Sequence, residues 1–206
     1  MKNANILSFQ AEFNFMNRAV IIIIGSFLLF CACRGEAKNE VIKEVKSKGL
    51  NQTIIAGDIR YEIMYRSAAS MAAIGSIEDP GGAINDQRYR EHFKQQEDYQ
   101  YIIIRQRVHH KNVNVLKYRA ENHQVYEGRV YYYNTDIIRD IRLFCEGAQL
   151  APVASQYENN MDIIPYNTLI FAFEKCPSRG KSLKVEFDDI PLGNKNITAE
   201  FNLNEI

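Results

Sequence analysis

The chain carries no net charge, because 25 lysine and arginine residues balance 25 aspartate and glutamate residues. Nonspecific binding to nucleic acid depends on neutralising phosphates, which requires an excess of basic residues. The sequence also contains neither a basic arm nor a zinc knuckle. We therefore expect no nucleic-acid partner.

Recognisable catalytic motifs are also missing: there is no Gly-x-Ser-x-Gly elbow, no His-Glu-x-x-His pair and no phosphate-binding glycine loop. His92 and His123 lack partners at metal-ligand spacing, and on a strand the adjacent His109 and His110 would point to opposite faces. The Asp188-Asp189 pair ends a predicted strand and suggests either a cation site or, more commonly, a solvated turn. We expect no metal site and no cofactor.

No apolar run reaches the roughly 20 residues that a helix needs to cross a bilayer. The longest apolar stretch, residues 19–30, follows Arg18 and ends before Arg34. A basic residue followed by a short apolar core is typical of a secretory signal peptide. Met16 is a better start for such a peptide than Met1, so residues 1–15 can stem from a wrongly chosen initiation codon.

The segment Phe30-Cys31-Ala32-Cys33-Arg34-Gly35 resembles the lipobox of bacterial lipoproteins, in which a small residue precedes the cysteine that is acylated. The resemblance covers residues 16–35 and implies that residues 1–32 are removed and that Cys33 carries the lipid. Arg34 is not the aspartate that often retains such proteins in the inner membrane, which favours the outer membrane. The alternative is that Cys31 and Cys33 are ordinary residues of a cleaved signal peptide.

After export, Cys145 and Cys176 would be the two remaining cysteines. An isolated pair in an oxidising compartment is expected to form a disulfide, and the alternative is two buried thiols. A bridge that closes a loop of this length would contribute about 3 to 4 kcal/mol to stability.

We expect a charged tether over residues 33–52, followed by one domain over residues 53–206. Ile59, Tyr61 and Ile63 alternate with Arg60 and Glu62, which is the pattern of a half-buried strand. Similar runs separated by turns predict a mainly β fold, an antiparallel β-sandwich that is immunoglobulin-like or related. These further strands are expected at Tyr99–Val108, Val113–Ala120, Val125–Tyr133, Ile137–Cys145, Leu169–Phe173, Leu183–Phe187 and Ile197–Leu203.

Residues 67–98 interrupt the strand pattern, because small residues and then helix-forming residues replace the β-branched ones. We interpret this segment as an excursion with one or two short helices. Such an excursion either carries function or covers an open end of the sandwich.

A basic face is the main candidate binding site. If residues 101–108 and 113–119 paired as a hairpin, Ile102 would lie opposite Tyr118 and Ile104 opposite Leu116. The same register would gather four cations on the other face, where an anionic lipid or glycan could bind. A solvated, charged sheet face is the alternative. The four candidate residues are Arg105, Arg107, Lys117 and Arg119.

The consecutive tyrosines Tyr131, Tyr132 and Tyr133 would alternate between the faces of a strand, leaving at least one ring accessible. Accessible aromatic rings can stack on sugars or on a protein partner, whereas core packing is their commoner use.

These features together predict a lipid-anchored envelope lipoprotein that acts as a non-catalytic binding or assembly module. Its partners would be the membrane, through the anchor, and another envelope protein or an anionic glycan or lipid. One alternative is an envelope enzyme whose active site no motif reveals. Another is an inhibitor or immunity-type lipoprotein that blocks its partner with an exposed loop within residues 67–98.

Overall fold

The computed structural model describes residues 50–78, 84–158, 164–176 and 182–205. The leader, Cys33 and most of the expected tether lie outside these residues. The first strand begins at Asn51, close to the expected start of the domain.

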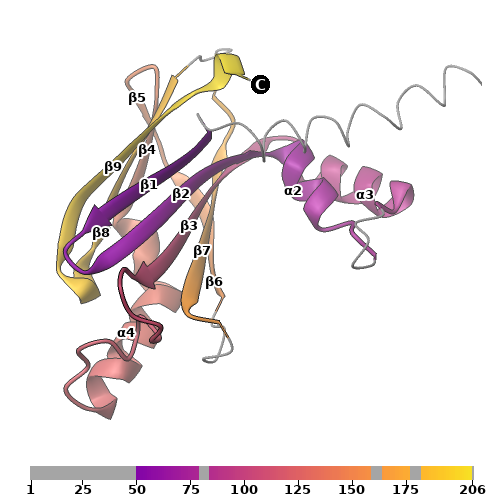
Figure 1. The fold of residues 1–206 in the computed structure, drawn as a ribbon. Helices are drawn as coiled ribbons and strands as arrows, with labels where there is room; N and C mark the ends of the chain where they lie inside the picture. Colours follow the sequence, from indigo (N-terminus) through magenta and orange to yellow (C-terminus); the bar gives the residue numbers. More distant parts are fainter. Residues whose placement is uncertain (1–49, 79–83, 159–163, 177–181, 206) are drawn as a thin grey trace, which may run out of the picture. The chain divides into compact units, whose positions relative to one another are not determined.

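Two antiparallel sheets form the body of the protein (Figure 1). The five-stranded sheet has the order β1-β2-β3-β7-β6, and the four-stranded sheet has the order β5-β4-β8-β9. The prediction of a mainly β, antiparallel sandwich is therefore confirmed. The strands are β1 (Asn51–Ala56), β2 (Ile59–Ser67), β3 (Tyr99–Val108), β4 (Ile141–Cys145), β5 (Ala148–Leu150), β6 (Pro152–Glu158), β7 (Tyr166–Glu174), β8 (Ser182–Asp189) and β9 (Asn194–Asn202).

The inner faces of the two sheets share one apolar core. Alternation along β2 turns Tyr61 and Tyr65 toward the other sheet, where they meet Phe187 and Phe201 at ring-centroid distances of 6.1 and 6.4 Å. Each fully buried aromatic side chain stabilises the fold by roughly 1.5 to 3 kcal/mol relative to exposure. The alternation predicted for β2 thus places both tyrosines in the core between the two sheets.

The predicted disulfide is present between Cys145, at the end of β4, and Cys176, two residues beyond β7. The two Cα atoms are 6.0 Å apart. Because β4 and β7 belong to different sheets, the bridge ties the two layers of the sandwich together.

The predicted helical excursion contains α2 (Ala68–Ile74) and α3 (Asp86–Gln96). Ser67 begins α2 by accepting a hydrogen bond from the Ser70 amide at 3.1 Å. Asn85 begins α3 by accepting from the amides of Gln87 and Arg88, each at 3.0 Å. These caps satisfy backbone donors that have no partner inside the helix.

Two predicted strands are wrong. Val125–Tyr133 lies within the helix α4 (His123–Thr135), which begins where Asn122 accepts a hydrogen bond from the Val125 amide. Val113–Ala120 forms an irregular loop, because both edges of β3 are already paired, one with β2 and the other with β7. The strand predicted at Ile137–Cys145 begins only at Ile141, after the short 3₁₀ helix η2 (Ile137–Arg139). Two further 3₁₀ helices are η3 (Ile190–Leu192) and η4 (Leu203–Glu205).

Candidate functional site

Arginine side chains gather on the outer face of the five-stranded sheet, near the end of β3. Because residues alternate along each strand, Arg60 on β2 and Arg107 on β3 both point outward, and the register places them directly opposite each other. Ile55 on β1 and Tyr166 on β7 flank this pair in the same row. Like charges that face each other across a strand pair destabilise a sheet, so this arrangement needs an explanation.

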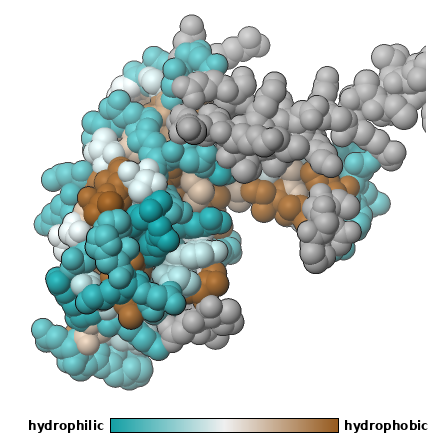
Figure 2. Space-filling model, in the orientation of Figure 1, coloured by the Kyte–Doolittle hydropathy of each residue, from teal (hydrophilic) through white to brown (hydrophobic). Residues whose placement is uncertain are grey.

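One carboxylate serves both guanidinium groups. Glu62 Oε1 lies 3.1 Å from Arg60 Nη2 and 3.9 Å from Arg107 Nη2. Arg105 adds a third positive charge, with its guanidinium carbon 5.2 Å from the ring centroid of Tyr166. The outer face of β2 and β3 therefore carries more positive than negative charge, and hydrophilic residues cover much of the front of the β body in Figure 2.

The loop that follows β3 extends this positive charge. Asp58, in the turn between β1 and β2, accepts a hydrogen bond from the Tyr118 hydroxyl at 2.9 Å and pairs with Arg119 Nη2 at 2.7 Å. The Lys111 ammonium and the Arg119 guanidinium lie 5.4 and 5.2 Å from the centroid of the Tyr118 ring. Among the described residues, no carboxylate forms an ion pair with Lys111.

We call the following residues the basic surface. Among the described residues, three of them form ion pairs, Arg60 and Arg107 with Glu62 and Arg119 with Asp58, whereas the other two lie against tyrosine rings. Its members are Arg60, Arg105, Arg107, Lys111 and Arg119.

His109 connects the sheet part of the basic surface to its loop part. Its backbone amide donates to the Asp58 carbonyl at 2.8 Å. Burial lowers the pKa of His109 below its usual value, and the nearby His110, Arg60 and Arg107 lower it further. A histidine whose pKa is depressed by neighbouring cations lies in a region of positive potential.

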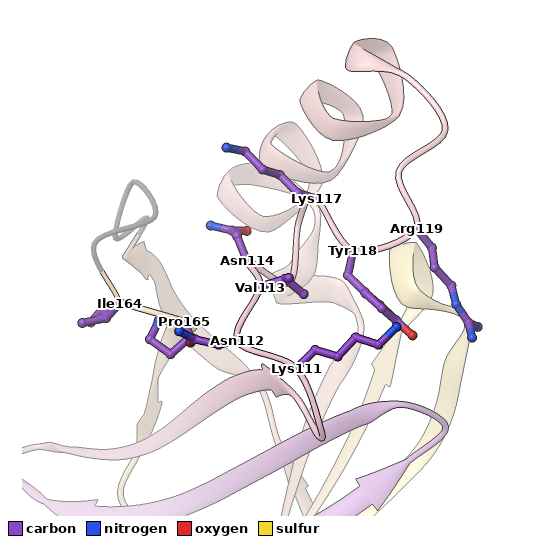
Figure 3. A pocket seen from close by; sticks show the side chains of 9 residues that line it. All are labelled: Lys111, Asn112, Val113, Asn114, Lys117, Tyr118, Arg119, Ile164 and Pro165. Atoms are coloured by element: carbon purple, nitrogen blue, oxygen red, sulfur yellow. The ribbon is translucent and has the colours of Figure 1, made fainter.

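The loop between β3 and α4 also forms one wall of an open pocket of about 530 Å³ (Figure 3). In Figure 3 Lys111 extends toward the Tyr118 ring, whereas Lys117 and Arg119 point away from each other. A second hollow of about 150 Å³ adjoins the first, because Tyr118 and Arg119 line both. The larger pocket is lined by Lys111, Asn112, Val113, Asn114, Lys117, Tyr118, Arg119, Ile164 and Pro165.

Helix α4 holds this loop in place through Arg129. Its Nη1 atom donates to the carbonyl oxygens of Leu116 and Tyr118 at 2.9 and 2.7 Å. Val115 and Leu116 are fully buried and fix the loop to the core. The loop is thus an ordered wall rather than a free connection.

The structure separates the four cations that the sequence placed together. Arg105 and Arg107 lie on the outer sheet face as predicted, but Lys117 and Arg119 belong to the loop. The predicted hairpin register is wrong, since Ile102 pairs with Tyr65 and Phe171 rather than with Tyr118. Ile104 likewise pairs with Ile63 and Leu169 rather than with Leu116.

Sequence reasoning missed Arg60 and Lys111 as members of the same surface. The alternation in β2 already placed Arg60 on the outer face, but its position opposite Arg107 depends on the pairing of β2 with β3. That pairing spans the helical excursion and leaves no local signal in the sequence.

A second cluster is buried beneath α4. Asp189 was expected in a solvated turn, which is wrong: the residue is fully buried. Tyr61 and Tyr133 donate their hydroxyl protons to its carboxylate at 2.7 and 2.6 Å, and Gln106 Nε2 donates at 2.8 Å. Burial raises the pKa of Asp189 to about 6, although the two tyrosine hydrogen bonds oppose the rise.

The neighbouring Asp188 has a different environment. It accepts a hydrogen bond from the Asn196 amide at 2.8 Å, and its other oxygen lies 3.4 Å from Arg142 Nη2. The two carboxylates therefore do not form a joint cation site. Because donors occupy the Asp189 oxygens and solvent does not reach them, this cluster is a buried structural network rather than an open reaction centre.

The histidines and tyrosines take local roles. His109 and His110 follow β3 in a turn, and their ring centroids are only 3.7 Å apart. Tyr131 is exposed while Tyr133 is buried, as an alternating strand would also place them, but here they belong to α4. In residues 50–78, 84–158, 164–176 and 182–205, no group of three or more His, Cys, Asp or Glu residues could hold a metal ion.

Comparison with known proteins gives no relative: no family model, no curated protein and no solved structure matches the chain. None of the helices in the described part of the chain is long and apolar enough to cross a membrane. Functional inference therefore depends on the residues and their geometry.

Proposed function

We propose that the chain is an exported lipoprotein, acylated at Cys33 and held at the outer membrane, whose β-sandwich is a non-catalytic module that binds an anionic ligand. In this proposal the leader and Cys33 direct the protein to the outer membrane, and the basic surface is the binding site. The ligand is an anionic glycan or lipid, or an acidic surface of another envelope protein.

The disulfide supports the export of this domain. Bridges of this kind persist in oxidising compartments such as the bacterial periplasm and are rare in the cytosol. Cys145 ends β4 and Cys176 follows β7 of the other sheet by two residues, so their pairing is part of the folded body.

The basic surface is the observation that carries the proposed binding function. Five cations lie there and, among the described residues, only two carboxylates form ion pairs with them, in a chain whose total charge is zero. The surface adjoins an open pocket in which Lys111 has no acidic partner among the described residues. Arginine and lysine donors in such an arrangement bind carboxylate, phosphate and sulfate groups.

The anchor is tested by mass spectrometry of the chain isolated from cell membranes. We expect an amino-terminal peptide that begins at Cys33 and carries acyl chains, and we expect Cys33→Ser to abolish both acylation and cleavage. An unmodified amino terminus at residue 33, or a full-length chain in the soluble fraction, would contradict the proposed lipid anchor.

The binding function is tested with a fluorescent heparin oligosaccharide and the full chain in neutral detergent, by fluorescence anisotropy. Charged hydrogen bonds contribute about 1.5 to 3 kcal/mol, so Lys111→Glu should weaken binding about tenfold or more. Lys94→Glu on α3 reverses an exposed charge outside the basic surface and should leave the affinity within about twofold. Equal losses in both variants, or no binding by the parent chain, would rule out a specific anionic site.

A further inference from the structure

We infer that the outer face of β2 and β3 holds a tetrahedral oxyanion, a phosphate or sulfate group, between Arg60, Arg107 and His109. This inference rests on the proposed function and narrows its ligand from any anion to one that carries such a group.

Unpaired buried nitrogen atoms mark this position. Arg60 Nε, Arg107 Nε and His109 Nδ1 are all buried, and none of them has a hydrogen-bond partner among the described residues. Buried polar atoms in folded proteins nearly always have a partner, so three unpaired nitrogens in one cluster indicate a missing acceptor. A bound anion would supply that acceptor.

The charge balance leads to the same conclusion. Arg60 and Arg107 face each other across β2 and β3, and Glu62 is the carboxylate they share. The more distant contact, from Arg107, is 3.9 Å and therefore longer than a hydrogen bond. A second negative group would compensate the charge that Glu62 leaves unpaired.

The donors approach from three places, which favours a tetrahedral group over a planar one. Arg60 extends from β2, Arg107 from β3, and His109 from the turn that follows β3. A carboxylate has two oxygens and is well suited to a single guanidinium fork, whereas phosphate and sulfate groups offer at least three oxygens in three directions. Ile55 and Tyr166 border the arginine pair in the same row of the sheet.

His109 is the reporter for the test. The charged and titratable groups that face it are Arg60 on β2, Arg107 on β3 and the adjacent His110, and its backbone is bonded to Asp58 in the β1–β2 turn. A bound oxyanion favours the protonated imidazole, so it should raise the pKa that the neighbouring cations depress.

The experiment records the imidazole NMR signals of the full chain across pH, in sodium phosphate, in sodium sulfate and in sodium chloride of equal ionic strength. We expect phosphate or sulfate to raise the pKa of His109 and chloride not to do so. Arg60→Gln and Arg107→Gln should each weaken anion binding, so that the half-saturating anion concentration rises about tenfold. Arg90→Gln on α3 is the matched control and should leave it unchanged, and thermal melting of each variant checks that it folds.

Two outcomes overturn the inference. One is a His109 signal that does not respond to either oxyanion, and the other is a response that persists in both arginine variants. If heparin binding then still depends on Lys111, the proposed function stands without this subsite. If the parent chain does not bind heparin at all, both the proposed function and the oxyanion subsite are ruled out. Vesicles of phosphatidylglycerol and of phosphatidylcholine, compared with the sulfated oligosaccharide, distinguish a lipid headgroup from a glycan as the source of the group.

Discussion

Asp189 stands in an environment that its side chain type usually avoids. It is fully buried, and two tyrosine hydroxyls and one glutamine amide donate to its carboxylate. Burial also raises the pKa of Tyr61 and Tyr133, so both remain protonated donors at neutral pH. These donors stabilise the carboxylate without fully offsetting the cost of removing it from water.

We predict that Asp189 makes the protein less stable as the pH rises. Its folded-state pKa of about 6 exceeds the ordinary value of 3.8. Its contribution to stability is therefore fully present below pH 3.8 and is lost as the pH rises through about 6, which corresponds to about 3 kcal/mol. Urea unfolding at pH 4 and pH 7.5 should show most of this difference in the parent chain and a correspondingly smaller one in Asp189→Asn. Equal pH dependence in the two proteins would contradict the assignment.

The Tyr133 hydroxyl should tune this transition. Its hydrogen bond lowers the pKa of Asp189, so Tyr133→Phe should raise that pKa further and move the pH window of stability loss upward. The shift is measured as the pH dependence of the urea midpoint. Tyr131→Phe on the exposed side of α4 is the control. If the pH window moves equally in both variants, the Tyr133 hydroxyl does not set the pKa of Asp189.

At the level of elements, α4 and the loop before it form a unit. The Arg129 guanidinium bonds two loop carbonyls, and the loop supplies Lys111 and Arg119 to the basic surface. The position of these cations thus depends on a helix that the sequence pattern did not predict.

Arg129→Ala should destabilise the protein by about 2 kcal/mol, because it leaves two carbonyl oxygens without their charged donor. Arg139→Ala, which removes an exposed guanidinium from η2, should cost less than about 0.5 kcal/mol. Urea unfolding measures both changes, and hydrogen exchange should show faster exchange of the loop amides in the first variant alone. Similar effects of the two substitutions would show that the loop does not depend on α4.

The error at α4 has a physical cause. Tyr126, Val130, Tyr133 and Ile137 face the core at spacings of four, three and four, which is helical periodicity. Three consecutive tyrosines and Val125 obscured this spacing, because aromatic and β-branched residues also favour strands. Asn122 as an N-cap was the available signal. By contrast, β3 was predicted with its correct bounds, because its alternation is continuous over ten residues.

At the level of the whole molecule, the disulfide adds a covalent link between layers that side-chain packing and the hydrogen bonds to Asp189 also hold together. We predict that Cys145→Ala with Cys176→Ala lowers the free energy of unfolding by about 3 to 4 kcal/mol. A reductant should lower the stability of the parent chain by a similar amount and leave the double variant unaffected. A urea midpoint of the parent chain that does not change on reduction would contradict this role for the bridge.

The sandwich itself was predictable because burial of one sheet face imposes a two-residue period that survives in the sequence. The basic surface was less predictable from the sequence. The total charge of zero gives no sign that Arg60, Arg107 and Lys111 gather near the end of β3, because this arrangement depends on strand pairing and on a loop held by α4. Asp189 looked like a turn residue because the tyrosines that surround it are distant in the chain.

The most direct test of the account is the salt dependence of heparin oligosaccharide binding by the full chain and by the double variant Arg107→Glu, Lys111→Glu. If the basic surface binds the anion, the affinity of the parent chain falls steeply with increasing sodium chloride, and the double variant binds at least about a hundredfold more weakly at low salt. The matched variant Arg90→Glu, Lys94→Glu, which reverses the same number of charges on α3, should behave like the parent chain. Equal affinity and equal salt dependence in all three proteins would contradict the claim that this surface is the binding site.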